Sequence, residues 1–199
     1  MNTQLSPRLE AGGLRVQFIL RGDRHAHEIW LRDGVDWVCV LESVEGSEQD
    51  SWPDSPPLQS LHLKTSAAGR PLALLVGMAG TNHWSASIAI DAESSQGDFD
   101  PKVDFDIACR VRGAERGILG NRYRARVAVE ALDEHGATFA LSSGKRLRLI
   151  VDQQWGAARL EPAEEGVRLV VSMPSSAAAA ETIRWGYSLE LAADRKSVV

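Results

Sequence analysis

The sequence predicts an all-β protein, an antiparallel two-sheet β-sandwich of about twelve strands, with a β-barrel as the alternative. Three observations predict it. Short segments alternate apolar and polar residues along most of the 199-residue chain, turn residues separate them, and no longer repeat is present. Residues 103–112 are the clearest case, because Val103, Phe105, Ile107 and Cys109 share one face while most residues between them are charged. Such regular strand spacing favours two packed sheets or a barrel.

Six strands are expected before residue 103. Turn signals at Gly22-Asp23 and Asp33-Gly34 separate the first three, which we expect to form a meander. The continuous apolar run at 71–76 is typical of a strand covered on both faces. The expected ranges are 14–20, 25–31, 37–44, 58–64, 71–76 and 84–90.

The strand pattern breaks at residues 45–57. This segment holds Pro53, Pro56 and Pro57, and proline has no N–H to donate to a sheet ladder. A connector of this length is often functional. We expect it to lie at the same end of the sandwich as the glycine-rich turn at 77–82, because two strands separate them.

The second half of the chain predicts six more strands and one short helical turn. The alanine-rich turn at 175–181 is too short to form a helix alone. Residues 13–193 then form one domain, with mobile tails at 1–12 and 194–199. The expected strand ranges are 103–112, 123–131, 137–141, 147–151, 167–173 and 183–191.

Composition restricts the class of protein. A net charge of -5 argues against general nucleic-acid binding, which needs a basic surface. We see neither an export signal nor a membrane-spanning run, so we expect a soluble, cytoplasmic protein with no membrane partner and no cofactor.

Cys39 and Cys109 fall on apolar strand phases and should be small buried hydrophobes, although a disulfide is possible. The oligomeric state stays open.

One candidate binding site combines Trp52, Asn82, His83 and Trp84. An indole ring stacks on the apolar face of a sugar, while amide and imidazole groups bond its hydroxyls. Trp52 lies in the proline-containing segment and is expected to be exposed. The alternative interpretation is that Trp84 belongs to the core, since it is in phase with Ile88 and Ile90.

A second candidate is an anion site made of arginines. If residues 103–112 and 122–131 pair as a hairpin, their outward arginines converge near the connecting loop, and guanidinium groups match carboxylate and phosphate geometry. The alternative is a solvated face with cross-strand ion pairs to Asp104, Asp106 and Glu130. The arginines proposed for the anion site are Arg110, Arg112, Arg122 and Arg124.

His25 and His27 leave the same face of one strand and could begin a metal site with a carboxylate and a distant histidine. Their face also carries Ile29 and Leu31, which favours partly buried, hydrogen-bonded histidines. We therefore expect no metal site.

No motif assigns an activity. The sequence has no Gly-x-Ser-x-Gly and no glycine-rich phosphate loop before a helix. The first hypothesis is a non-catalytic protein that binds a small polar, carbohydrate-like ligand or a protein partner.

The strand plan, with His and Trp near strand ends, resembles large β-sandwiches of the aldose-mutarotase type in architecture alone. That resemblance implies the alternative, a mutarotase- or epimerase-type enzyme with a histidine acid/base, which requires a histidine and a carboxylate in one concave pocket.

Overall fold

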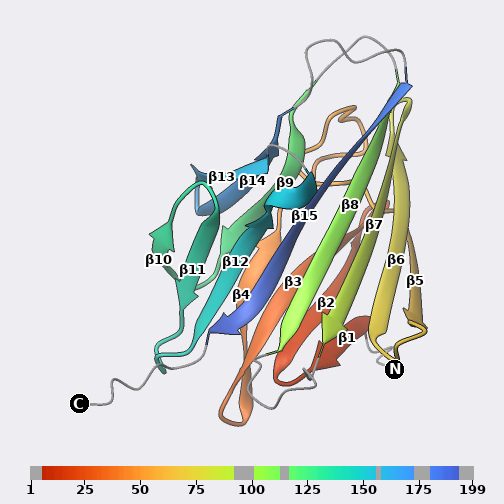
Figure 1. Ribbon diagram of the computed structural model, residues 1–199. Helices are drawn as coiled ribbons and strands as arrows, with labels where there is room; N and C mark the ends of the chain where they lie inside the picture. Colours follow the sequence, from red (N-terminus) through yellow and green to blue (C-terminus); the bar gives the residue numbers. More distant parts are fainter. Residues whose placement is uncertain (1–5, 92–100, 113–116, 156–157, 173–179, 193–199) are drawn as a thin grey trace.

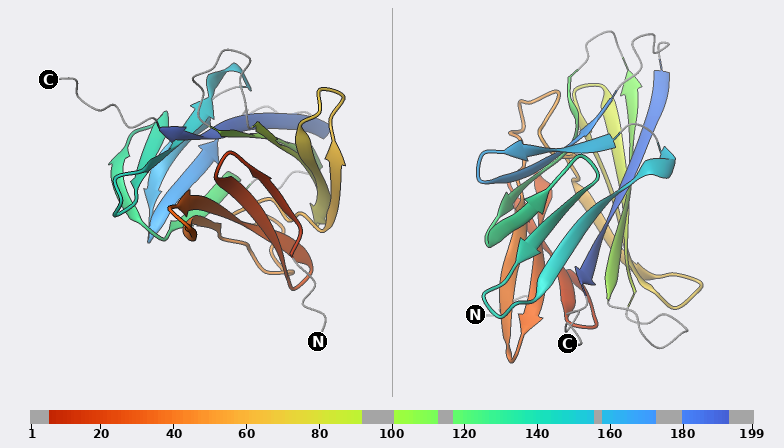
Figure 2. Two further views of the ribbon diagram at one scale, coloured as in Figure 1. Left: turned by 90° about the horizontal axis from the view of Figure 1, so that it is seen from below. Right: turned by 60° about the vertical axis from the view of Figure 1, so that its left-hand side comes forward.

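The computed structural model describes residues 6–91, 101–112, 117–155, 158–172 and 180–192, which form two antiparallel sheets packed as layers (Figures 1 and 2). Sheet A has seven strands and sheet B has eight, and they are not closed into a barrel. The sandwich predicted from the sequence is therefore confirmed. The only helix in these ranges is one 3-10 turn, η1 (Gln153–Trp155).

The strands alternate between the sheets in blocks. Sheet A has the order β1-β2-β3-β4-β9-β14-β13 and sheet B the order β10-β11-β12-β15-β8-β7-β6-β5. The strands of sheet A are β1 (Arg8–Ala11), β2 (Leu14–Arg21), β3 (Arg24–Asp33), β4 (Asp36–Ser43), β9 (Leu119–Ala125), β13 (Ala158–Ala163) and β14 (Gly166–Val171). Those of sheet B are β5 (Ser60–Thr65), β6 (Pro71–Ala79), β7 (Asn82–Asp91), β8 (Lys102–Arg112), β10 (Ala128–Leu132), β11 (Gly136–Ala140), β12 (Arg146–Asp152) and β15 (Ala180–Ala192).

Three of the fifteen strands in the described ranges were not expected. Arg8–Ala11 was placed in a tail but forms β1, which pairs with β2. The expected strand at 123–131 is two strands in different sheets, because the chain leaves sheet A after Ala125 and enters sheet B at Ala128. The third, β13, contains Pro162 and lies at an edge, where a missing N–H is tolerated. Residues 173–179, which cover most of the expected helical turn, and the tail at 194–199 lie outside the described residues.

The core fills the space between the sheets. The inner residues of β8 from Val103 to Val111 are buried, as their alternation predicted. The outer face of β6 differs from the expectation. The run at 71–76 was expected to be covered on both sides, yet Val76 and Met78 are 51% and 45% exposed. No described element of the chain packs over them, so the apolar outer side of β6 faces solvent.

The two cysteines are free thiols in different sheets. Cys109 is buried in β8 and Cys39 is partly buried in β4. Burial raises the pKa of each thiol to about 12, with the charges of Glu28 and Glu42 adding to the effect at Cys39. The prediction of a buried thiol is therefore confirmed for Cys109, whereas Cys39 is only partly buried.

Replacing Ile107 by alanine tests the inner face of β8. Ile107 is 2% exposed, so Ile107→Ala should lower the free energy of unfolding by about 2–5 kcal/mol. Asp106, on the opposite side of the strand, forms a solvent-exposed ion pair with Arg184, and Asp106→Ala should cost less than about 1 kcal/mol. Urea unfolding measures both values, and equal losses would contradict the assigned faces.

Candidate functional site

The segment between β4 and β5 covers one end of the sandwich and is fastened to sheet A. The amide of Val44 donates to the carbonyl oxygen of Arg122, and the Ser55 hydroxyl accepts from the Arg122 amide at 3.1 Å. The Asp54 carboxylate lies between two guanidinium groups, those of Arg122 at 2.9 Å and Arg168 at 2.7 Å. The long connector is therefore an ordered cap on the end of the fold.

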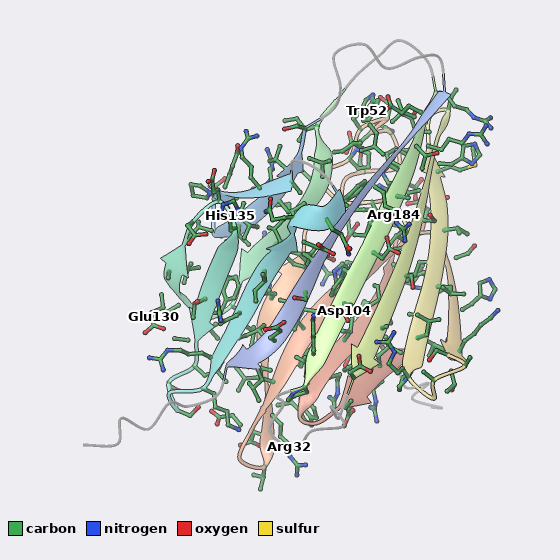
Figure 3. The ribbon with its side chains drawn as sticks, viewed as in Figure 1. Arg32, Trp52, Asp104, Glu130, His135 and Arg184 are labelled. Atoms are coloured by element: carbon green, nitrogen blue, oxygen red, sulfur yellow. The ribbon has the colours of Figure 1, made fainter. Side chains whose placement is uncertain are left out.

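The cap also packs tightly against sheet B. A side chain at Gly77 of β6 would meet the carbonyl oxygen of Pro57, with only 1.7 Å from its Cβ position. The Trp52 ring packs edge-on against Trp84, with 6.4 Å between ring centroids, and Ser51 lies close to Gly80. The cap and the turn after β6 lie at the same end, as the sequence predicted. Figure 3 labels Trp52 at this end.

The structure divides the four candidate sugar-binding residues between two sides of sheet B. Asn82 and Trp84 are buried, and the Asn82 side-chain oxygen accepts from the Arg112 amide at 2.8 Å. Trp52 is partly buried beneath the sheet, against Trp84, rather than exposed. His83 faces the opposite way because successive residues of a strand alternate between faces. The four side chains do not form one constellation, and His83 alone faces outward.

On the outer side, His83 joins Arg110 in a shallow depression of about 560 Å³. The two residues are direct cross-strand partners on β7 and β8. Val76 and Met78 provide an apolar wall. Other described residues that line the depression include Gln59, Ser60, Ser85 and Thr182.

The lining of this depression is basic. No described carboxylate lines it, and within the described residues neither Arg110 nor His83 forms an ion pair. Arg110 is exposed and His83 is half-buried. The next outward residue of β8, Arg112, is exposed as well. An exposed guanidinium with no internal carboxylate is available to an external anion.

The other proposed anion-site arginines lie elsewhere. β8 and β9 do not form a hairpin: β8 pairs with β7 and β15 in sheet B, whereas β9 pairs with β4 and β14 in sheet A. Arg122 and Arg124 are therefore separated from Arg110 and Arg112. Arg124 contacts Glu165 at 2.7 Å, and Arg122 holds Asp54 of the cap. The hairpin prediction was wrong because the chain changes sheets between these strands.

A second depression, of about 580 Å³, lies farther along the outer face of sheet B and is acidic. Asp104, Asp106, Asp152 and Glu190 line it. Lys102 contacts Asp104 at 3.1 Å and Glu190 at 3.5 Å, so part of this charge is compensated within the chain. No described histidine lines this depression. Histidine and carboxylate, which the enzyme alternative requires together, thus line different depressions.

The core contains a hydrogen-bonded series of side chains that the sequence did not predict. The Tyr123 hydroxyl lies 2.6 Å from His27 Nε2 and 2.5 Å from the Tyr187 hydroxyl, and all three side chains are buried. This series of hydrogen bonds joins β3 and β9 of sheet A to β15 of sheet B. Trp185 reinforces this link by donating from Nε1 to the Asn121 side chain at 3.0 Å. The available signal was a tyrosine in phase with core residues, since a buried Tyr hydroxyl requires a polar partner.

Of the two histidines on β3, His27 is buried and hydrogen-bonded, as the alternative interpretation expected, whereas His25 is half-buried without such a bond at Nδ1. His27 is fully buried, which lowers its pKa to about 4, and its amide donates to the Ser43 hydroxyl. Burial also lowers the pKa of half-buried His25, whose Nδ1 has no hydrogen-bond partner. Among the described residues no cluster of three His, Cys, Asp or Glu side chains could hold a metal ion.

Glu45 lies at the start of the cap, close enough to the hydrogen-bonded Tyr123 and Tyr187 to act on both electrostatically. The Ser43 hydroxyl donates to its Oε1 at 2.6 Å, while its Oε2 has no partner. Burial raises the pKa of Glu45 to about 7, against the lowering effects of the Ser43 hydrogen bond and of the charges on Arg24 and Arg21. The carboxyl group therefore titrates near neutral pH inside the fold.

No protein-family model matches the chain, and no curated protein matches its sequence. The described part of the chain also has no helix with the length and apolarity needed to cross a membrane. Functional inference therefore rests on the geometry of the two depressions.

Removing the Tyr123 hydroxyl should destabilise the protein more than removing that of Tyr187. Tyr123→Phe leaves His27 Nε2 and the Tyr187 hydroxyl without a partner, and each unsatisfied buried group costs about 1–3 kcal/mol. Tyr187→Phe leaves the Tyr123–His27 hydrogen bond in place. Urea unfolding at one fixed pH compares the two variants. A larger loss of unfolding free energy in Tyr187→Phe would contradict the order His27–Tyr123–Tyr187 of the hydrogen bonds.

Glu45 should make stability depend on pH. Its folded-state pKa is raised from the ordinary 4.5 to about 7, so the folded protein holds a proton that the unfolded chain releases. Stability should therefore fall as the pH rises from about 4.5 through 7. The rise in pKa corresponds to about 3 kcal/mol.

Glu45→Gln should not show this loss of stability with rising pH, because the amide does not titrate. The free energy of unfolding of the wild type, minus that of Glu45→Gln, should drop by about 3 kcal/mol between pH 4.5 and pH 8. The opposite titration of His27, which costs stability as the pH falls from 6.5 through about 4, is common to both proteins and cancels in the difference. A difference that does not vary with pH would contradict the assignment.

Proposed function

We propose that this chain is a non-catalytic binding protein for a small, carbohydrate-like ligand with an anionic group, held in the basic depression on sheet B. The observation that carries the proposal is the pairing of exposed Arg110 with half-buried His83, neither of which has a carboxylate partner within the described residues. An arginine fork fits a carboxylate or phosphate with two parallel hydrogen bonds. A sugar acid or sugar phosphate supplies such a group.

The remaining lining suits the rest of a sugar. The hydroxyls of Ser60, Ser85 and Thr182 offer hydrogen bonds to ligand hydroxyls. Val76 and Met78 offer an apolar wall to the C–H face of a ring. The buried side chains of Asn82 and Trp84 and the partly buried ring of Trp52 support the strand from the inner side of the sheet.

Catalysis has less support than binding. A mutarotase-type mechanism needs a carboxylate close to the histidine to complete the acid/base pair. The described residues around His83 supply a guanidinium instead, and four carboxylates of sheet B line the other depression. An arginine beside a histidine favours holding an anion over moving a proton.

Calorimetric titration with glucuronate and glucose 6-phosphate, with glucose as the neutral probe, tests the proposal. The two anionic sugars should bind more tightly than glucose. Arg110→Ala and His83→Ala should each weaken their binding by about tenfold or more, equivalent to at least about 1.4 kcal/mol.

Arg148→Ala is the matched control, because Arg148 is an exposed arginine on β12 outside the depression. It should leave the affinities unchanged. Binding that does not depend on Arg110 or His83, or that shows no preference for the anionic sugars, would contradict the proposal.

A further inference from the structure

The outer side of β6 is an apolar row that nothing in the described chain covers. Leu72, Leu74, Val76 and Met78 all point away from the core, since they alternate with the buried Ala73, Leu75 and Ala79. Val76 and Met78 are exposed, and Leu72 and Leu74 are half-buried. Isolated exposed apolar residues are ordinary, but these four form a continuous strip along one strand. The outward side chains of β7 beside this strip are small, with Ser85, Ser87 and Ala89 in succession.

The next strand, β8, divides the same face into two halves of opposite charge. Ala108 lies at the middle of its outward row. Arg110 and Arg112 follow on one side, and Asp106 and Asp104 on the other. On β7, His83 lies beside Arg110 at the basic end, and Asp91 lies at the other end. The outward row of β8 ends there at Lys102, which pairs with Asp104 and Glu190. Figure 3 labels Asp104 on β8 and Arg184 on β15, farther toward the cap.

We propose that this outer face is a dimerisation surface, and that its occupant is a second copy of the same chain turned through a twofold axis. With the axis in the plane of the interface and perpendicular to the strands, β6 lies over β6 and β8 over β8, in opposite directions. The apolar rows then cover each other. The arginines of each β8 face the aspartates of the other.

Charge complementarity selects this partner. A face with a basic half and an acidic half is complementary to its own copy when the strand direction is reversed, and opposed charges suppress other arrangements. Lys102 and Arg184 contact Asp104 and Asp106 within the chain. A carboxylate accepts hydrogen bonds from more than one cation, so these contacts leave room for the arginines of the second copy.

The area is sufficient. The five neighbouring strands β15, β8, β7, β6 and β5 present a face of about 24 Å by 27 Å, or roughly 650 Å², from the usual strand spacing and rise. Two such faces bury about 1,300 Å² in total, which lies within the range of about 1,200–2,000 Å² that stable interfaces bury. The small residues of β7 allow the two sheets to approach to the usual sheet-packing distance of about 10 Å.

The dimer goes beyond the proposed ligand binding and does not depend on it. The two would compete, because the second copy covers Arg110. Leu74 lies in the apolar row but outside the basic depression, so Leu74→Glu disrupts the dimer and leaves the ligand site intact. Failure of one proposal is therefore distinguishable from failure of the other.

Sedimentation equilibrium across a concentration series gives the first test. The wild-type protein without ligand should have twice the chain mass of 21.7 kDa, and Leu74→Glu should be monomeric. Leu20→Glu is the control, since Leu20 is an exposed leucine on β2 of the other sheet, and it should remain dimeric. A monomeric wild type, or a Leu74→Glu dimer as stable as the wild type, would overturn the proposal.

Reversing the charges of one half of the face in each of two variants gives the second test. It also controls for misfolding, because two misfolded variants would not associate on mixing. One variant carries Arg110→Glu and Arg112→Glu, and the other carries Asp104→Arg and Asp106→Arg. Each alone places like charges opposite each other and should be monomeric at low salt. Mixed together, they should form a dimer that contains one chain of each. Two monomers that do not associate on mixing, although each keeps the β-type circular dichroism of the wild type, would overturn the proposed pairing.

Discussion

The hydroxyl of Tyr123 is the contact on which the rest of the arrangement depends. It joins His27 in sheet A to Tyr187 in sheet B inside a core that is otherwise mainly apolar. Apolar packing alone tolerates small slips of one sheet over another, because it is not directional. A buried hydrogen bond permits one relative position, since misplacement leaves unsatisfied polar groups. The Asn121–Trp185 bond fixes the same pair of strands at a second point.

This cross-link also positions the outer face of sheet B. β15 carries Trp185 and Tyr187 on its inner side and pairs directly with β8. The position of β15 therefore sets the position of Arg110 and, through β7, of His83. The cap contributes from the other direction, since Trp52 packs beneath Trp84, the neighbour of His83. The core and the cap thus determine the geometry of this surface depression from beneath the sheet.

The sequence predicted the sandwich and the inner face of β8 because a half-buried strand needs a period of two. It could not predict where the chain changes sheets. The alternation in Tyr123, Ala125, Val127 and Val129 continues through a corner, so one expected strand is two. The same limit affected the site: His83 and Arg110 were assigned to different candidate sites, and pairing between β7 and β8 brings them together. Strand order depends on long-range packing, which local periodicity does not encode.

The burial of Cys109 and the partial burial of Cys39 have a practical consequence. With pKa values near 12, only about one molecule in 10⁵ carries a thiolate at pH 7, and the thiolate is the reactive form. Maleimide and iodoacetamide reagents should therefore pass over the native chain. A cysteine introduced at an exposed position would be the only fast-reacting group, so fluorophores or spin labels could be attached at a chosen point without first removing Cys39 or Cys109.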